Sequence, residues 1–331
     1  MHFLKRPPVR VSPVFDDRKI KIGISSCLLG EKVRYDGGHK QDRYLTDTLG
    51  RYVEWVPVCP EVEYGLPVPR DPMRLVDSPG GPRLVTIKTG VDHTDGMKAW
   101  SGKKLDTLER EGLSGFIFKS RSPSSGHSGV KVYSPSGVQI GKGRGIFAGA
   151  YTERFPLVPV EDEGRLNDPE LRENFIERVF VFKRWRDFIR TDGTTGGLVT
   201  FHTSIKLLLM SHSQKHYSLL GRMVAGENKG KPRAVYDRYI SLLMEGLKLI
   251  ATKKKNTNVL MHIAGYFKKM LSPDAKAELL ESIENYHKGL IPLIAPLTLI
   301  NHYVRLYDVQ YLKRQHYLNP HPLELMLRNH V

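Results

Sequence analysis

The chain changes its hydrophobic period at residues 191–197, TDGTTGG, and this change most constrains the fold. Before this segment, short β-branched and aromatic runs alternate with helical segments, which is typical of an α/β domain with a mostly parallel sheet. After it, the periodic segments have helical spacing. We therefore expect a Rossmann-like α/β N-terminal domain with a mostly parallel sheet, followed by an all-α C-terminal domain.

A chain of 331 residues is long enough for about two domains. The pattern predicts a loose, Pro- and Arg-rich arm over 1–18, a first domain over 19–166, a connecting helix and hinge over 167–197, and a helical domain over 198–331. Strands or extended segments are predicted at 19–25, 51–60, 83–89, 113–120, 143–151 and 155–166. Helices are predicted at 97–112, 167–190, 198–213, 233–252, 256–271, 272–290 and 295–307.

Composition is that of a soluble globular protein, with 40% apolar and 26% charged residues. No apolar run approaches the roughly 18 residues of a membrane span, and no apolar segment follows the basic N-terminal residues. We therefore expect a cytoplasmic protein without a membrane partner. The two cysteines are too few for a disulfide framework, so they indicate a metal, catalysis or simple burial.

The net charge is +16, and it is unevenly distributed. Residues 201–331 carry 19 Lys and Arg against 9 Asp and Glu, so this shorter part holds most of the excess. A basic field of this kind favours a polyanion such as nucleic acid, through phosphate neutralisation and counterion release. The alternative is a solvated basic surface that aids solubility.

Cys27, Cys59 and Ser125 each follow the end of a predicted strand. Because the carboxyl ends of parallel strands meet at one edge of a sheet, we group these three positions. Cys59 precedes Pro60 and Glu61, and a Cys-Pro pair often occurs at iron–sulfur ligands. Spacing alone leaves open that both cysteines are ordinary buried thiols.

Three loops of the first domain resemble the signature loops of bacterial thiouracil desulfidases of the TudS type. They read SCLLGEKVRYDGGHK (26–40), PVCPEVEYGLPVPRDP (57–72) and KSRSPSSG (119–126), within a resemblance that covers roughly 20–165. The second domain resembles the YbgA-like domain over about 195–320, through FHTSIKLLLMSHS (201–213), NVLMHIAGYFKK (258–269) and LIAPLTLINHY (293–303). The pair in one chain resembles the two-domain RudS proteins, which remove sulfur from thiouridine in transfer RNA.

The resemblance implies a [4Fe-4S] cluster on three cysteines, with the fourth iron free for substrate. The implied ligand positions are Cys27, Cys59 and Ser125, where the family has a third cysteine. A serine hydroxyl is a hard, high-pKa donor, while iron–sulfur clusters prefer thiolate. Ser125 therefore predicts a poorly held or absent cluster and an inactive or apo form, through either an engineered substitution or natural divergence.

The implied activity is a non-redox desulfidase that cleaves a C–S bond and releases hydrosulfide. Glu61 is the candidate for activating water or moving a proton, and Ser122 is a second catalytic candidate by family position. Arg34, Lys119 and Arg121 are candidates for binding phosphate or polarising the base, the alternative being ordinary loop cations.

Five lysines of the basic half are candidates for RNA binding: Lys253, Lys254, Lys255, Lys268 and Lys269. Cations interleaved with aromatic residues are typical of RNA-binding surfaces. The leading interpretation is thus a desulfidase for 4-thiouridine or 2-thiouridine in tRNA. There are two alternatives. One is the same chemistry on a small free thiobase such as thiouracil, and the other is a non-catalytic RNA-binding protein with a lapsed cluster site. The sequence leaves the oligomeric state open.

Overall fold

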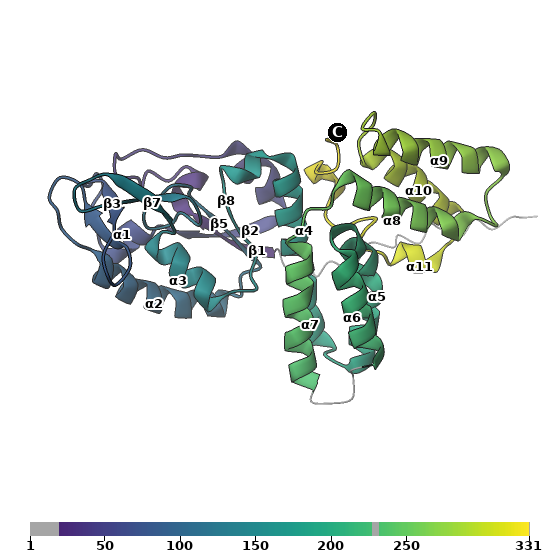
Figure 1. Cartoon of the computed structure of the whole chain (residues 1–331), viewed down its shortest axis with the longest axis horizontal. Helices are drawn as coiled ribbons and strands as arrows, with labels where there is room; N and C mark the ends of the chain where they lie inside the picture. The colour runs from purple at the N-terminus through teal and green to yellow at the C-terminus, as the bar shows by residue number, and fades with distance from the viewer. Residues whose placement is uncertain (1–19, 227–231, 331) are drawn as a thin grey trace, which may run out of the picture.

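A computed structural model of the chain describes residues 20–226 and 232–330, so the predicted arm over 1–18 lies outside the described residues. Figure 1 shows an α/β half and a helical half on either side of one long helix, α4 (Pro169–Thr191). This arrangement confirms the predicted fold class.

The main sheet has four strands in the order β2-β1-β5-β8, and all of its pairs are parallel. Its strands are β1 (Ile20–Ser25), β2 (Val53–Val58), β5 (Gly115–Phe118) and β8 (Val160–Asp162). Strand β5 has apolar side chains on both faces, as expected of a buried parallel strand. Its Ile117 packs towards α4, while Phe116 and Phe118 pack against α2 (Thr94–Glu111) and α3 (Ile146–Arg154).

A second, smaller sheet has the order β4-β3-β6-β7. Two antiparallel hairpins build it, and β3 pairs parallel with β6. Its strands are β3 (Met73–Val76), β4 (Arg83–Thr86), β6 (Val130–Tyr133) and β7 (Gln139–Gly143). The strand predicted at 83–89 belongs here, and the other three strands were not predicted.

The strand predicted at 143–151 is wrong, because most of this segment is helix α3. Its buried residues Phe147, Ala148 and Tyr151 fall on one helical face. Gly145 is the N-cap of this helix, and a Cβ atom added there would lie 2.5 Å from the carbonyl carbon of Ser124. Glycine is therefore required where α3 meets the third loop.

The helical half holds α5 (Thr195–His212) to α11, and the predicted helices there are confirmed with shifted ends. The remaining helices are α6 (Gln214–Gly226), α7 (Pro232–Leu247), α8 (Lys253–Ala264), α9 (Pro273–His287), α10 (Ile294–Leu306) and α11 (Gln310–Lys313). Ser272 caps α9 by accepting from Ala275 N at 3.2 Å. Among the described helices, none combines the length and apolarity that a membrane span requires.

Helix α4 contributes to the cores of both halves. Phe175 and Val179 pack with the β1 side chains, and Trp185 packs in the core of the helical half. The C-terminal tail, residues 314–330, returns to the core of the α/β half that holds the β1 isoleucines. Leu325 and Leu327 of this tail are buried there. The segment predicted as a hinge holds the end of α4 and the start of α5, so it makes a tight connection rather than an open linker. The division of the chain into domains there stays a prediction.

Candidate active site

Three loops at the carboxyl ends of β1, β2 and β5 enclose a cavity of about 500 Å³. Cys27, Cys59 and Ser125 all line this cavity, as do Glu61 and Ser122. The strand pairings explain why: Ser25 lies beside Val58, and β5 pairs with β1 on its other side. The structure thus places the three predicted ligand positions around one space.

Both cysteine thiols are buried, each with 8% of the residue exposed. Cys27 lies in a 3₁₀ turn (Ser26–Leu29), and its carbonyl accepts from Lys40 N at 2.9 Å. Burial raises the pKa of Cys27 to about 11, although nearby Lys119 opposes the shift. Burial and the Glu61 carboxylate raise the pKa of Cys59 to about 12. Both thiols therefore hold their protons at neutral pH unless a metal replaces them.

Glu61 lies in the first turn of helix α1 (Pro60–Tyr64) and is 9% exposed. Ser124 donates a hydrogen bond to its Oε1 at 2.5 Å, and its Oε2 lies 3.5 Å from the Cys59 sulfur. Arg70 Nη2 lies 3.8 Å from the same oxygen. This fixed carboxylate can hold or accept a proton beside the cavity.

The third loop carries three hydroxyls in mutual contact. Ser122 Oγ lies 2.9 Å from Ser124 Oγ and 3.4 Å from Ser125 Oγ, and it accepts from Ser125 N at 3.2 Å. The start of helix α3 holds this loop, because Phe147 N donates to the Ser124 carbonyl at 2.9 Å. Sequence reasoning missed Ser124, which is fully buried and lies behind the residues that line the cavity.

Two acidic side chains at the end of β8 hold the same loop. Asp162 accepts from the backbone N of His127 at 2.8 Å and of Ser128 at 3.1 Å. Glu163 accepts from Ser120 N at 2.5 Å and pairs with the Lys119 ammonium. The carboxylates therefore fix the geometry of the loop that carries Ser122 and Ser125.

The predicted substrate-binding cations all line the cavity but differ in their partners. The charge of Lys119 is neutralised by Glu163, which leaves this lysine a positioning role. Arg34 Nε is buried without a hydrogen-bond partner and lies 3.4 Å from Asp36 Oδ1. Arg121 is exposed and has no hydrogen bond or ion pair with the described residues.

Arg70 is a cavity residue that the sequence did not single out as functional. Its Nη1 donates to the Val33 carbonyl at 3.0 Å, and its backbone N donates to the Tyr35 carbonyl at 2.9 Å. These bonds tie the second loop to the first. The motif PVPRDP contained the only signal that could have found it.

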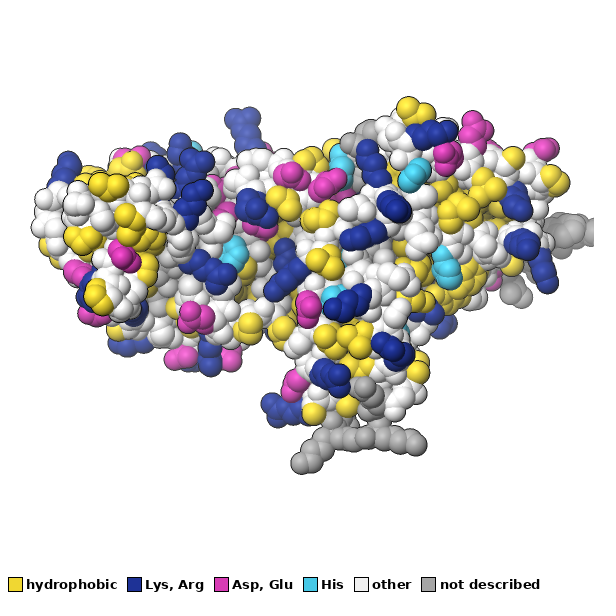
Figure 2. Space-filling model, in the orientation of Figure 1, with side chains coloured by type: hydrophobic (Ala, Val, Ile, Leu, Met, Phe, Trp, Pro, Cys, Tyr) yellow, Lys and Arg dark blue, Asp and Glu magenta, His cyan; other side chains and the backbone are white. Residues whose placement is uncertain are grey.

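The predicted RNA-binding lysines fall into two groups. Lys253, Lys254, Lys268 and Lys269 are exposed. The ammonium of Lys255 instead donates to the carbonyls of His212 and Ile250, each at 2.8 Å. These bonds give Lys255 a structural role, and its part in RNA binding stays a prediction. Figure 2 shows Lys and Arg side chains spread over both halves of one face of the molecule.

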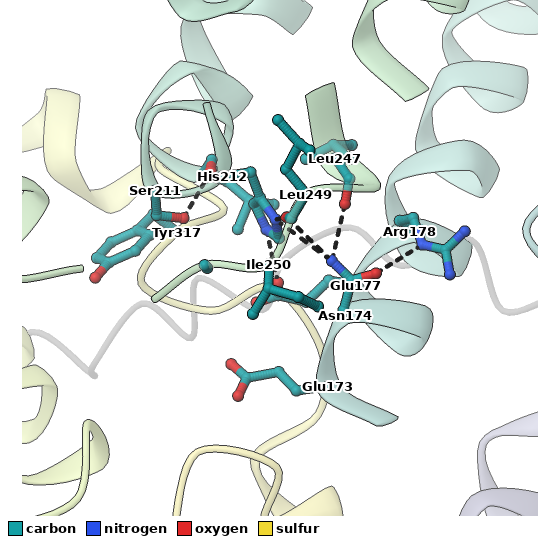
Figure 3. A network of polar contacts seen from close by, with 12 residues as sticks. Glu173, Asn174, Glu177, Arg178, Ser211, His212, Leu247, Leu249, Ile250 and Tyr317 are labelled. Carbon is teal, nitrogen blue, oxygen red and sulfur yellow. Dashed lines mark hydrogen bonds and ion pairs between the residues drawn. The ribbon is translucent and has the colours of Figure 1, made fainter. Parts of the chain in front are cut away.

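A second acidic group lies in the helical half, where α4 meets the C-terminal tail. Ligand atoms of Glu173, Glu177 and His321 lie within 4.8 Å of one another. Arg328 pairs with Glu173 at 2.9 Å and Glu177 at 2.7 Å. Glu177 also contacts His212 at 3.0 Å, and Figure 3 shows both residues within a larger network of polar contacts. Because Arg328 already supplies a positive charge to both carboxylates, we assign this network a structural role.

The cavity residues fit an iron–sulfur cluster in part of their donor chemistry. Cys27, Cys59 and Ser125 line the same cavity. Two thiols match iron in donor chemistry. The hydroxyl of Ser125 is a weaker donor at the third corner.

The fold and the site together define a two-domain protein. Its parallel α/β half places two buried cysteines and a glutamate at the strand ends, and a helical half follows. A family model described as 2-thiouracil desulfurase matches residues 22–163, and one described as a protein of unknown function (DUF1722) matches residues 206–322. The chain is 34% identical to the uncharacterized protein YbgA of Escherichia coli K12 over 165 residues, which is 50% of this chain and 98% of YbgA. The chain belongs to the YbgA family, and the segment that matches the 2-thiouracil desulfurase model lies in front of the DUF1722 match.

Two further proteins are similar to part of this chain. The uncharacterized protein YbbK of Bacillus subtilis 168 is 29% identical over 150 residues, which is 44% of this chain and 97% of YbbK. A solved structure described as the [4Fe-4S]-dependent thiouracil desulfidase TudS is 32% identical and covers 45% of this chain and 94% of its own, with a TM-score of 0.38. The two-domain resemblance is therefore confirmed, and the desulfurase match supports a desulfidase-like, C–S bond-cleaving function for the first domain.

Proposed function

We propose that the chain is built to remove sulfur from thiouridine in tRNA as a [4Fe-4S]-dependent desulfidase. The observation that carries the proposal is that Cys27, Cys59 and Ser125 line one cavity together with Glu61. In the reaction, an oxygen atom from water replaces the thiocarbonyl sulfur, which leaves as hydrosulfide. No electrons are gained or lost, so no external reductant is needed.

Cys27, Cys59 and the residue at position 125 would hold the cluster. A bound cluster would supply an open iron as a Lewis acid for the thiocarbonyl sulfur. Glu61 would take the proton from the attacking water, because its carboxylate reaches the cavity and Ser124 and Arg70 fix its orientation. Ser122 would position water or the base from the opposite loop.

Ser125 supports a further part of the proposal, namely that the chain with serine holds the cluster weakly and has low activity. Its hydroxyl already contacts Ser122 and Ser124 at 3.4 and 3.2 Å, and it would have to lose its proton to match a thiolate. The same observation favours a second candidate function, an RNA-binding protein whose cluster site has lapsed.

The tRNA substrate is supported by the charge of the helical half and by the exposed lysines at the start of α8 and beyond its end. A free thiobase carries no phosphate, so a basic surface adds nothing to its binding. The RNA would use the lysines for affinity, and the thiobase would be extruded to reach the cavity.

The test is anaerobic loading with iron and sulfide, followed by incubation with thiolated tRNA or free thiouracil. The proposal predicts that the Ser125→Cys variant releases sulfide and that tRNA loses its thionucleoside absorbance. Sulfide from free thiouracil alone would instead assign the activity to the small base. If loaded Ser125→Cys releases sulfide from neither substrate while the full chain still binds tRNA, the lapsed-site function is correct.

A further inference from the structure

The rim of the cavity holds an aromatic ring that the mechanism above does not use. Tyr35 lines the cavity but is 44% exposed, and it belongs to none of the hydrophobic clusters of the described residues. The ring is therefore available for contact with a ligand at the mouth of the cavity.

The ring is held on a closed turn rather than on a loose arm. Arg34 N donates to the Gly38 carbonyl at 3.2 Å, Gly37 N donates to the Arg34 carbonyl at 2.9 Å, and Gly38 N donates to Asp36 Oδ1 at 3.0 Å. The Tyr35 carbonyl accepts from Arg70 N at 2.9 Å, which joins the turn to the second loop. The backbone that carries the ring is therefore preorganised, which lowers the entropy lost on binding.

A planar cation accompanies the ring. The Arg34 guanidinium carbon lies 5.4 Å from the centroid of the Tyr35 ring. Its Nε atom forms an ion pair with Asp36 Oδ1 at 3.4 Å, and Arg34 lines the cavity. Tyrosine and arginine planes together make a surface on which a nucleobase stacks.

The depth of Tyr35 in the cavity indicates which base of the RNA can stack on its ring. The reacting base must reach the buried Cys27 and Cys59 sulfurs, whereas nearly half of Tyr35 faces solvent. A base stacked on Tyr35 therefore lies outside the reacting position. Lys40 and Arg121 are exposed, line the same cavity and have no ion pair with the described residues. They can therefore contact phosphates of the RNA strand.

We infer that Tyr35 is the stacking platform for the nucleotide that flanks the reacting thiouridine in a single-stranded or splayed RNA segment. The inference rests on the proposed function and adds a subsite that a free thiobase leaves empty. Arg34 contacts the same nucleotide, and Lys40 and Arg121 contact its phosphates. The site then selects a thiobase within a strand over the free base.

The test compares equilibrium binding of two ligands to the full chain: a trinucleotide with thiouridine in the middle, and free thiouracil. Tyr35→Ala should weaken trinucleotide binding roughly 5- to 150-fold, the range of stacking losses on alanine substitution. Tyr35→Phe keeps the ring and should bind nearly as the unchanged chain does. Neither variant should alter binding of free thiouracil.

Tyr133→Ala is the matched control, because Arg74 covers the Tyr133 ring at 5.6 Å and neither residue lines the cavity. Unchanged trinucleotide binding by Tyr35→Ala, equal losses for both ligands, or a trinucleotide that binds no better than the free base would overturn the inference. These binding results need no turnover, so they separate a failed subsite from a failed desulfidase, which the sulfide assay above reports independently.

Discussion

Ser124 donates a hydrogen bond to Glu61 at 2.5 Å, although the two residues lie 63 positions apart in the chain. The bond joins the second and third loops of the cavity and leaves the other Glu61 oxygen beside Cys59 at 3.5 Å. Ser124 is fully buried, so this bond is shielded from water. The carboxylate is thus held in one orientation before any substrate binds.

Glu61→Gln should lower sulfide release by about 100-fold or more in the cluster-loaded Ser125→Cys background, because general-base catalysis contributes about 10²–10⁴-fold. The amide keeps an acceptor for Ser124 but removes the base. Glu63→Gln is the control, because Glu63 accepts from Cys59 N and pairs with Lys104 instead. Equal rates for the two variants, at equal iron content, would refute the role of Glu61.

Substitution of the exposed lysines of α8 should affect tRNA binding more than substitution of the hydrogen-bonded Lys255. Lys253→Ala combined with Lys254→Ala should weaken tRNA binding and lower the slope of log affinity against log salt by about 0.9 for each phosphate that is no longer neutralised. Lys255→Ala should instead lower the melting temperature, because two carbonyls lose their donor. A salt slope that changes only in the Lys255 variant would reverse this assignment.

Stability should fall on acidification below neutral pH. Burial lowers the pKa of His202 to about 4, from an ordinary value of 6.5. Between these values the unfolded chain binds a proton that the folded chain excludes, so stability is lost as the pH falls from about 6.5 to 4. At pH 5 His202 alone accounts for about 2 kcal/mol.

Thermal unfolding at pH 7 and pH 5 measures this effect. His202→Gln removes the titrating group and should show a smaller drop in melting temperature than the unchanged chain. His287→Gln is a suitable control, because His287 is exposed at the end of α9. The role of His202 is refuted if both variants lose as much stability as the unchanged chain.

Leu325→Ala should destabilise the α/β half by about 2–5 kcal/mol, the usual cost of truncating a buried leucine. Leu325 is 3% exposed in the core that holds the β1 isoleucines, whereas Leu323, two residues earlier, is 68% exposed. Leu323→Ala is therefore the control in denaturant unfolding. Similar midpoints for the two variants would mean that the tail does not stabilise the core of the α/β half.

This tail also determines how the two halves should be tested. Removing residues from about 195 onward would delete Leu325 and Leu327 and expose the Trp185 face of α4. Such a truncation would disturb the α/β half as well as RNA binding. Point substitutions of exposed lysines are the cleaner experiment.

The sequence predicted the grouping of Cys27, Cys59 and Ser125, because parallel strands bring their carboxyl ends to one edge. It did not predict Ser124 or Arg70, because their partners Glu61 and Val33 are distant in sequence. Lys119 and Lys255 were predicted as ligand-binding cations, but buried or backbone partners occupy them. A sequence shows that a charge is present but does not show which folded neighbour neutralises it.

The error at α3 has a different cause. Gly143, Gly145 and Gly149 interrupt the apolar run, so it resembled a short strand between turns. In the fold, Gly145 is needed for close contact with the third loop, and the helix that follows donates to that loop. Tertiary contact therefore decides both the helix and the position of Ser125.

The most direct test of the central claim is the iron and sulfide content of the unchanged chain and of Ser125→Cys after the same anaerobic loading. We predict about four irons and four sulfides per chain for Ser125→Cys, as a [4Fe-4S] cluster requires. We predict clearly less for the unchanged chain, and loss of the cluster from Ser125→Cys when Cys59 is also changed to serine. Equal, low iron in all three proteins would contradict the claim that these residues form the three corners of a cluster site.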